Sequence, residues 1–279
     1  MSELTVLQMV SVPDVNANLD FVEQQLSAMP REPRLVVLPE CFACFGGKDR
    51  AQLAIAEPFG EGPIQKRLAD MARRHGLWLV SGTLPIQSAD PDRFFAASLL
   101  FDDQGQIRAR FDKMHLFDVK VADNTGTYAE SATTVPGHAP TVVDTPFGRL
   151  GMAVCYDIRF AELFAFYRQA QVDILVLPAA FTAKTGQAHW EVLCRARAIE
   201  GQCWLLGANQ GGSHANGRET WGHSMIVNPW GEVVAELGLG PGQLSTSLDE
   251  RLAGQIRQAM PVDKHRRFTL TPPDIKEHS

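Results

Sequence analysis

Short apolar runs alternate along the 279-residue chain with longer segments whose apolar residues recur three and four positions apart. Runs such as Leu35–Leu38 and Ile174–Leu177 are apolar throughout, which is typical of strands buried on both faces. In Gly62–His75 the apolar residues fall on one face of a helix instead. The pattern therefore predicts buried strands that alternate with amphipathic helices.

The predicted elements form two successive sets of similar order. Strands are expected at Leu4–Val12, Leu35–Leu38, Leu77–Thr83, Phe94–Phe101, Ile107–Phe111, Thr141–Asp144, Arg149–Val154, Ile174–Leu177, Cys203–Ala208, Gly222–Val227, Glu232–Leu237 and Gln243–Leu248. Helices are expected at Asn16–Met29, Gly62–His75, Arg159–Ala170, Gln187–Ile199 and Asp249–Met260. Between the sets, Lys113–Pro140 is predicted to be a long irregular loop, and such loops are usually functional.

This order predicts an α/β fold, a layered sandwich of two similar halves. No low-complexity linker divides the chain, so we expect one domain over residues 1–279. The last part of that domain, 261–279, is expected to be an extended C-terminal tail.

The bulk composition excludes several function classes. A net charge of −6 without a basic stripe disfavours nucleic acid and anionic membranes as partners. No stretch approaches the roughly 18 uninterrupted apolar residues that a membrane span needs. The N-terminal segment lacks a basic and apolar leader, and five scattered cysteines are typical of reduced thiols. We therefore expect a cytoplasmic globular protein.

The segment Leu150–Phe160 predicts a strand, a sharp turn and the start of a helix, with Cys155 at the turn. The partial positive charge of a helix start favours thiolate over thiol. Core burial is the alternative for a free cysteine. The polar residues Asp157 and Arg159 argue against inert burial, so Cys155 is a candidate nucleophile.

Two further candidates directly follow predicted strands. Glu40 lies among apolar neighbours after Leu35–Leu38, where burial would raise the pKa of its carboxyl toward that of a general base. Lys113 follows Ile107–Phe111, where an ammonium can stabilise a developing oxyanion. Taken alone, each of the two is more typical of an exposed loop residue.

Other kinds of active site find less support. The chain contains no Gly-x-Ser-x-Gly, no Gly-x-Gly-x-x-Gly after a strand and no phosphate-binding loop, so we expect no nucleotide cofactor. Cys41 and Cys44 form a Cys-x-x-Cys pair, but no second pair has ligand spacing, so we expect no metal. A thiol oxidoreductase that uses this pair is the weakest alternative.

Taken in order, three segments resemble the signature segments of the nitrilase, or carbon–nitrogen hydrolase, superfamily. They are Leu38–Glu40, Asp112–Phe117 and Gly151–Glu162. The resemblance covers nearly the whole chain and includes Gly186–Glu191, Arg195–Glu200, Trp221–Met225 and Asn228–Gly231. It implies a four-layer αββα sandwich, which agrees with the two predicted halves.

The resemblance also implies a mechanism without a cofactor. Glu40 takes a proton from Cys155, and the thiolate attacks the carbon of an amide. Lys113 and the backbone N–H of Tyr156 hold the oxyanion, and water later hydrolyses the thioester. Glu130 matches a second family glutamate that orients Lys113 and the substrate, with a solvated loop acid as the alternative.

Within the family, the quoted blocks are most similar to small amidases that act on ω-amides of α-keto acids. The resemblance implies hydrolysis of a small carboxylate-bearing amide to an acid plus ammonia, with deaminated glutathione favoured over α-ketoglutaramate and α-ketosuccinamate. Arg159 is the candidate for binding the carboxylate, unless it pairs with Asp157 or Glu162. Phe181 and Thr185 match pocket-lining positions of the family.

Two alternatives stay open at this point. A nitrilase acting on a C≡N bond shares the glutamate, lysine and cysteine, and a non-catalytic binding member would keep only the fold. Because family members pair through a dimer face, the resemblance implies a homodimer or a higher homo-oligomer.

Overall fold

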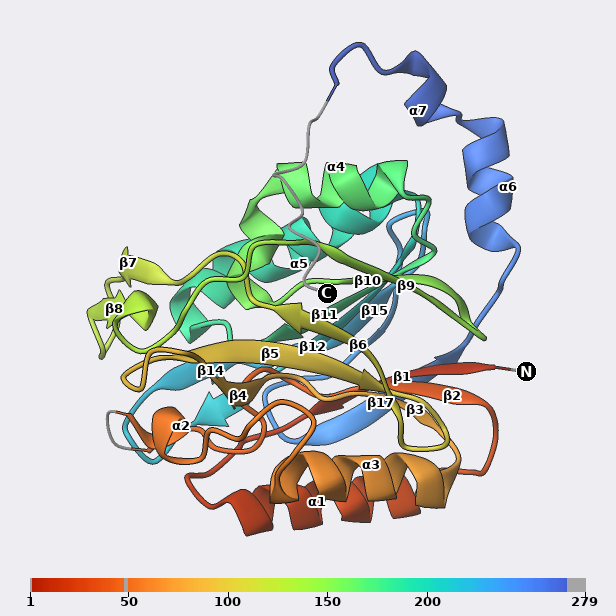
Figure 1. Ribbon diagram of the computed structural model, residues 1–279. Helices are drawn as coiled ribbons and strands as arrows, with labels where there is room; N and C mark the ends of the chain where they lie inside the picture. Colours follow the sequence, from red (N-terminus) through yellow and green to blue (C-terminus); the bar gives the residue numbers. More distant parts are fainter. Residues whose placement is uncertain (1, 48–49, 270–279) are drawn as a thin grey trace.

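Two β-sheets face each other in the computed structural model, which describes residues 2–47 and 50–269 (Figure 1). Helices α1 (Val15–Ser27) and α3 (Pro63–His75) cover the outer face of one sheet. Helices α4 (Ala161–Gln169) and α5 (Ala183–Gly201) cover the other sheet. This arrangement confirms the predicted αββα sandwich.

The first sheet is seven-stranded and joins strands of the first half to the last strand of the chain. Its order is β17-β1-β2-β3-β5-β4, and β6 pairs with β5. The strands are β1 (Glu3–Gln8), β2 (Arg34–Val37), β3 (Trp78–Val80), β4 (Leu84–Gln87), β5 (Phe94–Phe101), β6 (Ile107–Asp112) and β17 (Gly242–Ser247). β1, β2 and β3 run parallel, so their carboxyl ends meet at one edge.

The second sheet is six-stranded, in the order β16-β15-β12-β11-β10-β9. The strands are β9 (Thr141–Thr145), β10 (Gly148–Met152), β11 (Ile174–Ala179), β12 (Trp204–Asn209), β15 (Met225–Val227) and β16 (Val233–Glu236). Two small hairpins lie outside both sheets. They are β7 (Asp118–Lys120) with β8 (Thr127–Ala129), and β13 (Gly211–Ser213) with β14 (Glu219–Trp221).

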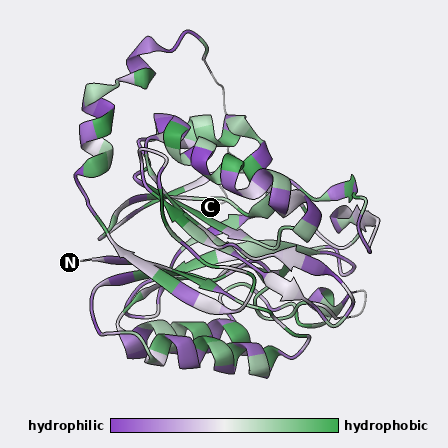
Figure 2. Ribbon diagram, turned by 180° about the vertical axis from the view of Figure 1, so that it is seen from behind, coloured by the Kyte–Doolittle hydropathy of each residue, from purple (hydrophilic) through white to green (hydrophobic). Residues whose placement is uncertain are grey.

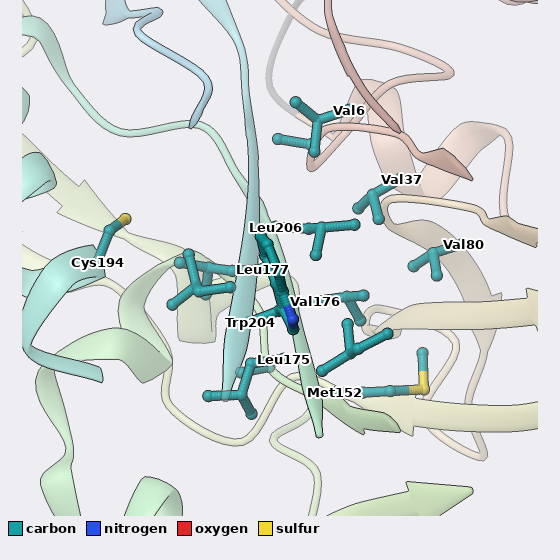
Figure 3. Packing of buried hydrophobic residues seen from close by; sticks show 14 of the residues in the cluster. Val6, Val37, Val80, Met152, Leu175, Val176, Leu177, Cys194, Trp204 and Leu206 are labelled. Atoms are coloured by element: carbon teal, nitrogen blue, oxygen red, sulfur yellow. The ribbon is translucent and has the colours of Figure 1, made fainter. Parts of the chain in front are cut away.

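The main hydrophobic core lies between the two sheets. Val6 and Val37 of the first sheet approach Val176 and Leu206 of the second (Figure 3). Because side chains alternate along a strand, Val36 points the other way and packs in the cluster under α1 and α3. The outer helices carry hydrophobic and hydrophilic residues in alternation along their length (Figure 2). Among the described helices, none combines the length and the apolar character that crossing a membrane requires.

Several elements differ from the sequence prediction. The strand expected at Leu77–Thr83 ends at Val80, and β4 begins at Leu84 after a bend. The predicted loop over 113–140 contains the β7–β8 hairpin and the 3₁₀ segment η1 (Glu130–Ala132).

The C-terminal tail also differs from its prediction. The tail, expected to be extended, folds into a helical turn, α7 (Val262–His265), after the helix α6 (Leu252–Ala259). The reason lies in its contacts, because Arg168 pairs with Asp263 and fixes that turn beside α4. The rest of the tail, 270–279, lies outside the described residues. A further short helix, α2 (Ala51–Ala54), follows Arg50 in the first half.

A glycine after β3 fixes the turn that follows β2. Gly82 has a φ of +66°, and a Cβ there would lie 2.0 Å from the carbonyl oxygen of Pro39. The next residue, Thr83, accepts a hydrogen bond from the N–H of Cys41 at 2.8 Å. The backbone on both sides of Glu40 is therefore held by the segment at Gly82 and Thr83.

Replacing Gly82 with Ala should destabilise the protein more than conformational strain alone explains. We expect a loss of about 3–5 kcal/mol in the free energy of unfolding, because left-handed strain and a backbone clash add. Gly76→Ala is the matched control, since Gly76 has a φ of +64° but no atom within 4 Å of a built Cβ. It should cost about 1–2 kcal/mol. Equal losses for the two variants in urea unfolding would show that the close approach to Pro39 does not matter.

Candidate active site

Three predicted residues meet where strands of both sheets end. Glu40 follows β2, Lys113 follows β6 directly, and Cys155 lies just beyond β10. All three, together with Glu130 of η1, line one cleft with a volume of about 1210 Å³. Residues that lie 115 positions apart in the sequence, from 40 to 155, thus share one concave site, as sites of α/β folds commonly do.

The Lys113 ammonium lies between two carboxylates. Its Nζ is 2.8 Å from Oε1 of Glu40 and 2.9 and 2.8 Å from the two oxygens of Glu130. The side chain is only 2% exposed. Burial alone would lower the pKa of Lys113, but the negative charges of Glu130 and Glu40 raise it well above its usual value. The amine therefore stays protonated.

Glu130 is held in the cleft by two different segments. Besides binding Lys113, its Oε2 accepts the backbone N–H of Phe117 at 2.7 Å. Burial raises the pKa of this carboxyl, and the charge of Glu40 acts in the same direction while Lys113 opposes it. The side chain faces the ammonium, which differs from the alternative of a solvated loop acid.

Cys155 occupies a strained backbone position at the turn. It begins the 3₁₀ segment η2 (Cys155–Arg159), has a φ of +47° and is 7% exposed. The pKa of the thiol is raised well above its ordinary value, first by burial and then by the charge of Glu40. Lys113 and the backbone N–H of Ala180 act the other way but do not prevail. This differs from the expectation that the helix start favours thiolate.

A fully buried aspartate, whose contacts the sequence did not reveal, connects two segments of the site. Asp157 accepts the N–H of Val154 and the N–H of His115, both at 2.9 Å. Its Oδ1 also lies 2.7 Å from Nδ1 of the His115 ring, which stacks on Phe160. Asp157 thereby ties the chain after Lys113 to the turn that carries Cys155. The signal was present in the sequence as a charged residue two positions after the cysteine.

The remaining predicted site residues line the same cleft. They are Tyr156, Arg159, Phe181 and Thr185. The guanidinium carbon of Arg159 lies 5.8 Å from the ring centre of Tyr156 and 5.2 Å from that of Phe181. In the described residues Arg159 forms no ion pair with Asp157 or Glu162, and its Nη1 is 3.2 Å from Nδ1 of His189. Thr185 shares a 2.8 Å hydroxyl hydrogen bond with Thr182.

Cys41 and Cys44 also line the cleft, as free thiols. Burial raises the pKa of both, which reduces the thiolate fraction that disulfide exchange requires. Within the described part of the chain, no group of three or more His, Cys, Asp or Glu side chains is arranged to hold a metal ion.

Comparison with known proteins identifies the family. Residues 3–258 match the family model described as carbon-nitrogen hydrolase. Deaminated glutathione amidase of Yersinia enterocolitica is 43% identical over 268 residues, which cover 96% of this chain and 93% of that protein. The Homo sapiens protein of the same name is 38% identical over 272 residues, which cover 96% of this chain and 83% of that protein.

Solved structures give the same result. Saccharomyces cerevisiae Nit3, a member of branch 10 of the nitrilase superfamily, has a TM-score of 0.84 and 31% identity over 95% of this chain and 96% of its own. The chain belongs to the carbon–nitrogen hydrolase family. It is a hydrolase that acts on carbon–nitrogen bonds other than peptide bonds.

Replacing Lys113 with Met should leave Glu40 and Glu130 facing each other without a cation. We expect the free energy of unfolding to fall by about 3–5 kcal/mol at pH 8. The pKa of Glu130, already raised, should rise further, so the folded variant binds a proton more tightly than its unfolded chain. The loss should therefore shrink as the pH falls from 8 to 5.5.

Urea unfolding at both pH values tests this expectation. Lys66→Met is the matched control, because Lys66 forms an exposed pair with Asp70 at 2.8 Å. That variant should lose less than about 1 kcal/mol and show no change between the two pH values. A loss for Lys113→Met that is the same at pH 8 and pH 5.5 would contradict the proposed charge balance.

Proposed function

We propose that the protein is a thiol amidase that hydrolyses deaminated glutathione through a thioester on Cys155. The observation that carries the proposal is the buried Lys113 ammonium, bound to Glu40 in the cleft that Cys155 lines. The relatives named deaminated glutathione amidase, 38% and 43% identical over most of the chain, support the substrate.

The first half of the reaction begins with a protonated thiol, because the pKa of Cys155 is raised. Glu40, whose charge acts directly on that thiol, takes its proton, and the sulfur attacks the amide carbon. The oxyanion forms beside the Lys113 ammonium and the backbone N–H of Tyr156. Glu40 then gives its proton to the leaving nitrogen, the C–N bond breaks, and an acyl thioester remains.

The second half of the reaction regenerates the enzyme. Glu40 removes a proton from a water molecule, which attacks the thioester carbon. The same ammonium and N–H stabilise the second oxyanion, and the thiolate departs and is reprotonated. Glu130 keeps the ammonium in place through its two contacts at 2.9 and 2.8 Å.

The chemistry of the substrate defines the products. Glutathione is γ-glutamylcysteinylglycine, and deamination replaces its α-amino group with a keto group. The scissile γ-amide nitrogen belongs to cysteine, so the leaving group is cysteinylglycine rather than ammonia, and the acid is 2-oxoglutarate. Ammonia would be released only from primary ω-amides such as α-ketoglutaramate. A cleft of about 1210 Å³ has room for the peptide leaving group.

The carboxylate of the keto acid requires a cation on the acyl side of Cys155. Arg159, four residues further along the chain, presents its guanidinium there without an acidic partner among the described residues. A planar guanidinium binds a carboxylate bidentately. Phe181 and Thr185 form the adjoining wall of the cleft.

Replacing Cys155 with Ala should abolish hydrolysis of deaminated glutathione. We expect kcat/KM to fall by at least about 10⁴-fold, because the thioester cannot form. Thermal stability should change little, since Ala fills most of the same buried space. Chromatographic detection of cysteinylglycine, together with an acyl adduct on wild-type Cys155 in intact-protein mass spectra, gives the measurement.

The other cysteines of the cleft provide the control. Cys41→Ser with Cys44→Ser should retain most of the amidase activity, whereas a thiol oxidoreductase would lose its function. Assays with α-ketoglutaramate and with an aliphatic nitrile separate the ω-amidase and nitrilase alternatives. Activity that survives in Cys155→Ala would refute the mechanism, and a wild-type protein inactive on all substrates would favour the non-catalytic alternative.

Our proposal extends to a homodimer or a higher homo-oligomer in the cytoplasm. Val192 and Ile199 of α5 are 67% and 50% exposed and lie seven residues apart, on one face of the helix. Trp230, 59% exposed, lies in the adjoining turn, where Arg195 of α5 donates to the carbonyl of Gly231. Exposed apolar patches of this kind support an association surface. Five free cysteines support a reducing location.

Placing charge on this patch should separate the subunits. We expect Ile199→Lys combined with Trp230→Glu to raise the dissociation constant by about 10- to 100-fold or more, because two apolar anchors are lost. Light scattering of the wild type should give the mass of at least two chains, and that of the variant a lower mass. Phe59→Glu, at an apolar residue 48% exposed in the other half, is the control. A wild-type mass of one chain would contradict the proposal.

A further inference from the structure

A second arginine reaches the cleft from a hairpin that contains none of the three signature segments. Arg218 lies in the loop between β13 and β14 and lines the same cleft as Cys155. Its guanidinium carbon is 4.8 Å from the ring centre of Tyr128 and 5.1 Å from that of Phe45. The guanidinium lies over both rings, and among the described residues no group accepts a hydrogen bond from its N–H donors, which leaves them for a ligand.

Within the described residues, no acidic side chain forms an ion pair with Arg218. The nearby Asp123 has its own partners, the N–H groups of Thr125 and Gly126 and the hydroxyl of Tyr128. Arg50, which lines the same cleft, differs because its guanidinium pairs with Asp92. Arg218 therefore presents a bidentate donor set without a direct ion pair, and Asp123 acts on its charge only from a longer distance.

Arg218 and Arg159 lie at opposite ends of a row of aromatic rings. Tyr128, which supports Arg218, is 5.1 Å from Phe117, and Phe117 is 5.1 Å from Tyr156. Tyr156 in turn lies under Arg159. Because the two guanidiniums rest on different rings of this row, Arg218 on Tyr128 and Arg159 on Tyr156, each offers a carboxylate its own place in the cleft.

The position of Arg218 assigns it to the leaving-group side of the site. Its ring partner Phe45 belongs to the segment 40–45, which begins with Glu40, the group that protonates the leaving nitrogen in the proposed mechanism. Arg159 lies over Phe181, which follows β11 of the second sheet, whereas Glu40 and Phe45 follow β2 of the first. An amine protonated by Glu40 thus leaves from the half of the site to which Phe45, the ring partner of Arg218, belongs.

We propose that Arg218 binds a carboxylate on the amine half of the substrate. The substrate class is therefore an amide with one carboxylate on its acyl half, held by Arg159, and a second on its leaving group. In deaminated glutathione this second group is the glycine carboxylate. The inference rests on the proposed function and adds to it the residue that distinguishes a peptide-like leaving group from ammonia.

Two substrates that differ in one group test the assignment. The first is deaminated glutathione, and the second is the same molecule with its glycine carboxylate converted to a carboxamide. Wild-type kcat/KM should be about 10- to 100-fold higher for the acid, because one charge-assisted bidentate contact is lost with the amide. Arg218→Gln should reduce kcat/KM for the acid by a similar factor and leave the amide nearly unchanged, which removes the discrimination.

Two further variants separate the effect of the Arg218 charge from any effect on folding. Arg218→Lys keeps a cation without the planar fork, so it should retain part of the preference for the acid. Arg67→Gln, at an arginine of α3 that does not line the cleft, should alter kcat/KM for either substrate by less than about twofold, since its exposed pair with Asp20 contributes little. Circular dichroism and thermal melts show whether each variant is folded.

The possible outcomes test the role of Arg218 separately from the proposed amidase function. Equal wild-type activity on acid and amide, or an Arg218→Gln variant equally impaired on both, would overturn the inference while the amidase function stands. The second of these results would assign Arg218 to packing of Phe45 and Tyr128. Hydrolysis of neither substrate by the wild type would overturn the proposed function and the inference together.

Discussion

A buried ammonium is the constraint on which the site depends. An unpaired ion of this size in a protein interior costs several kcal/mol, so Lys113, 2% exposed, requires its two carboxylates. Glu40 and Glu130 come from segments that are separate in the sequence, and Lys113 joins them. The ion cluster therefore fixes the loop beyond β6 to the end of β2.

This charge arrangement also affects the protonation of the Cys155 thiol, the proposed nucleophile. The carboxylate that neutralises Lys113 also acts on Cys155, and together with burial it raises the pKa of the thiol. A protonated thiol reacts slowly with oxidants and stray electrophiles. In the proposed mechanism a proton moves from Cys155 to Glu40, which removes the repulsion between the two groups. The proposed nucleophile then forms together with its general base, and an isolated thiolate is not needed.

The sequence predicted the fold and indicated the candidate chemical residues because both depend on simple patterns. Apolar strands such as Ile174–Leu177 were correct to within two residues of β11. Glu40, Lys113 and Cys155 were singled out because each follows a predicted strand, and the structure places all three in one cleft. Arg218 was missed for the opposite reason. Its hairpin contains Gly211, Gly212 and Gly217 and no apolar alternation, so no strand pattern was visible.

Contacts between distant segments could also not be predicted from the sequence. The pattern identified Asp157 as a polar residue near the nucleophile but did not show that it binds His115, 42 positions earlier in the chain. The left-handed backbone of Cys155 was equally hidden, because the strain is imposed by packing and not by a glycine. Recognition residues are harder to predict than chemical ones when they lie on small hairpins held by a few long-range hydrogen bonds.

The anchoring of the Arg218 hairpin shows how such a segment can still be rigid. His214 is 6% exposed, its Nδ1 lies 3.1 Å from the carbonyl oxygen of Ser11, and its Nε2 lies 2.8 Å from Oγ1 of Thr220. Burial lowers the pKa of this ring, and the charge of Arg218 acts in the same direction, so the imidazole is neutral at pH 7. A charged ring would repel the guanidinium that the hairpin carries. A neutral, fully hydrogen-bonded anchor holds Arg218 over the cleft and leaves its charge for the substrate.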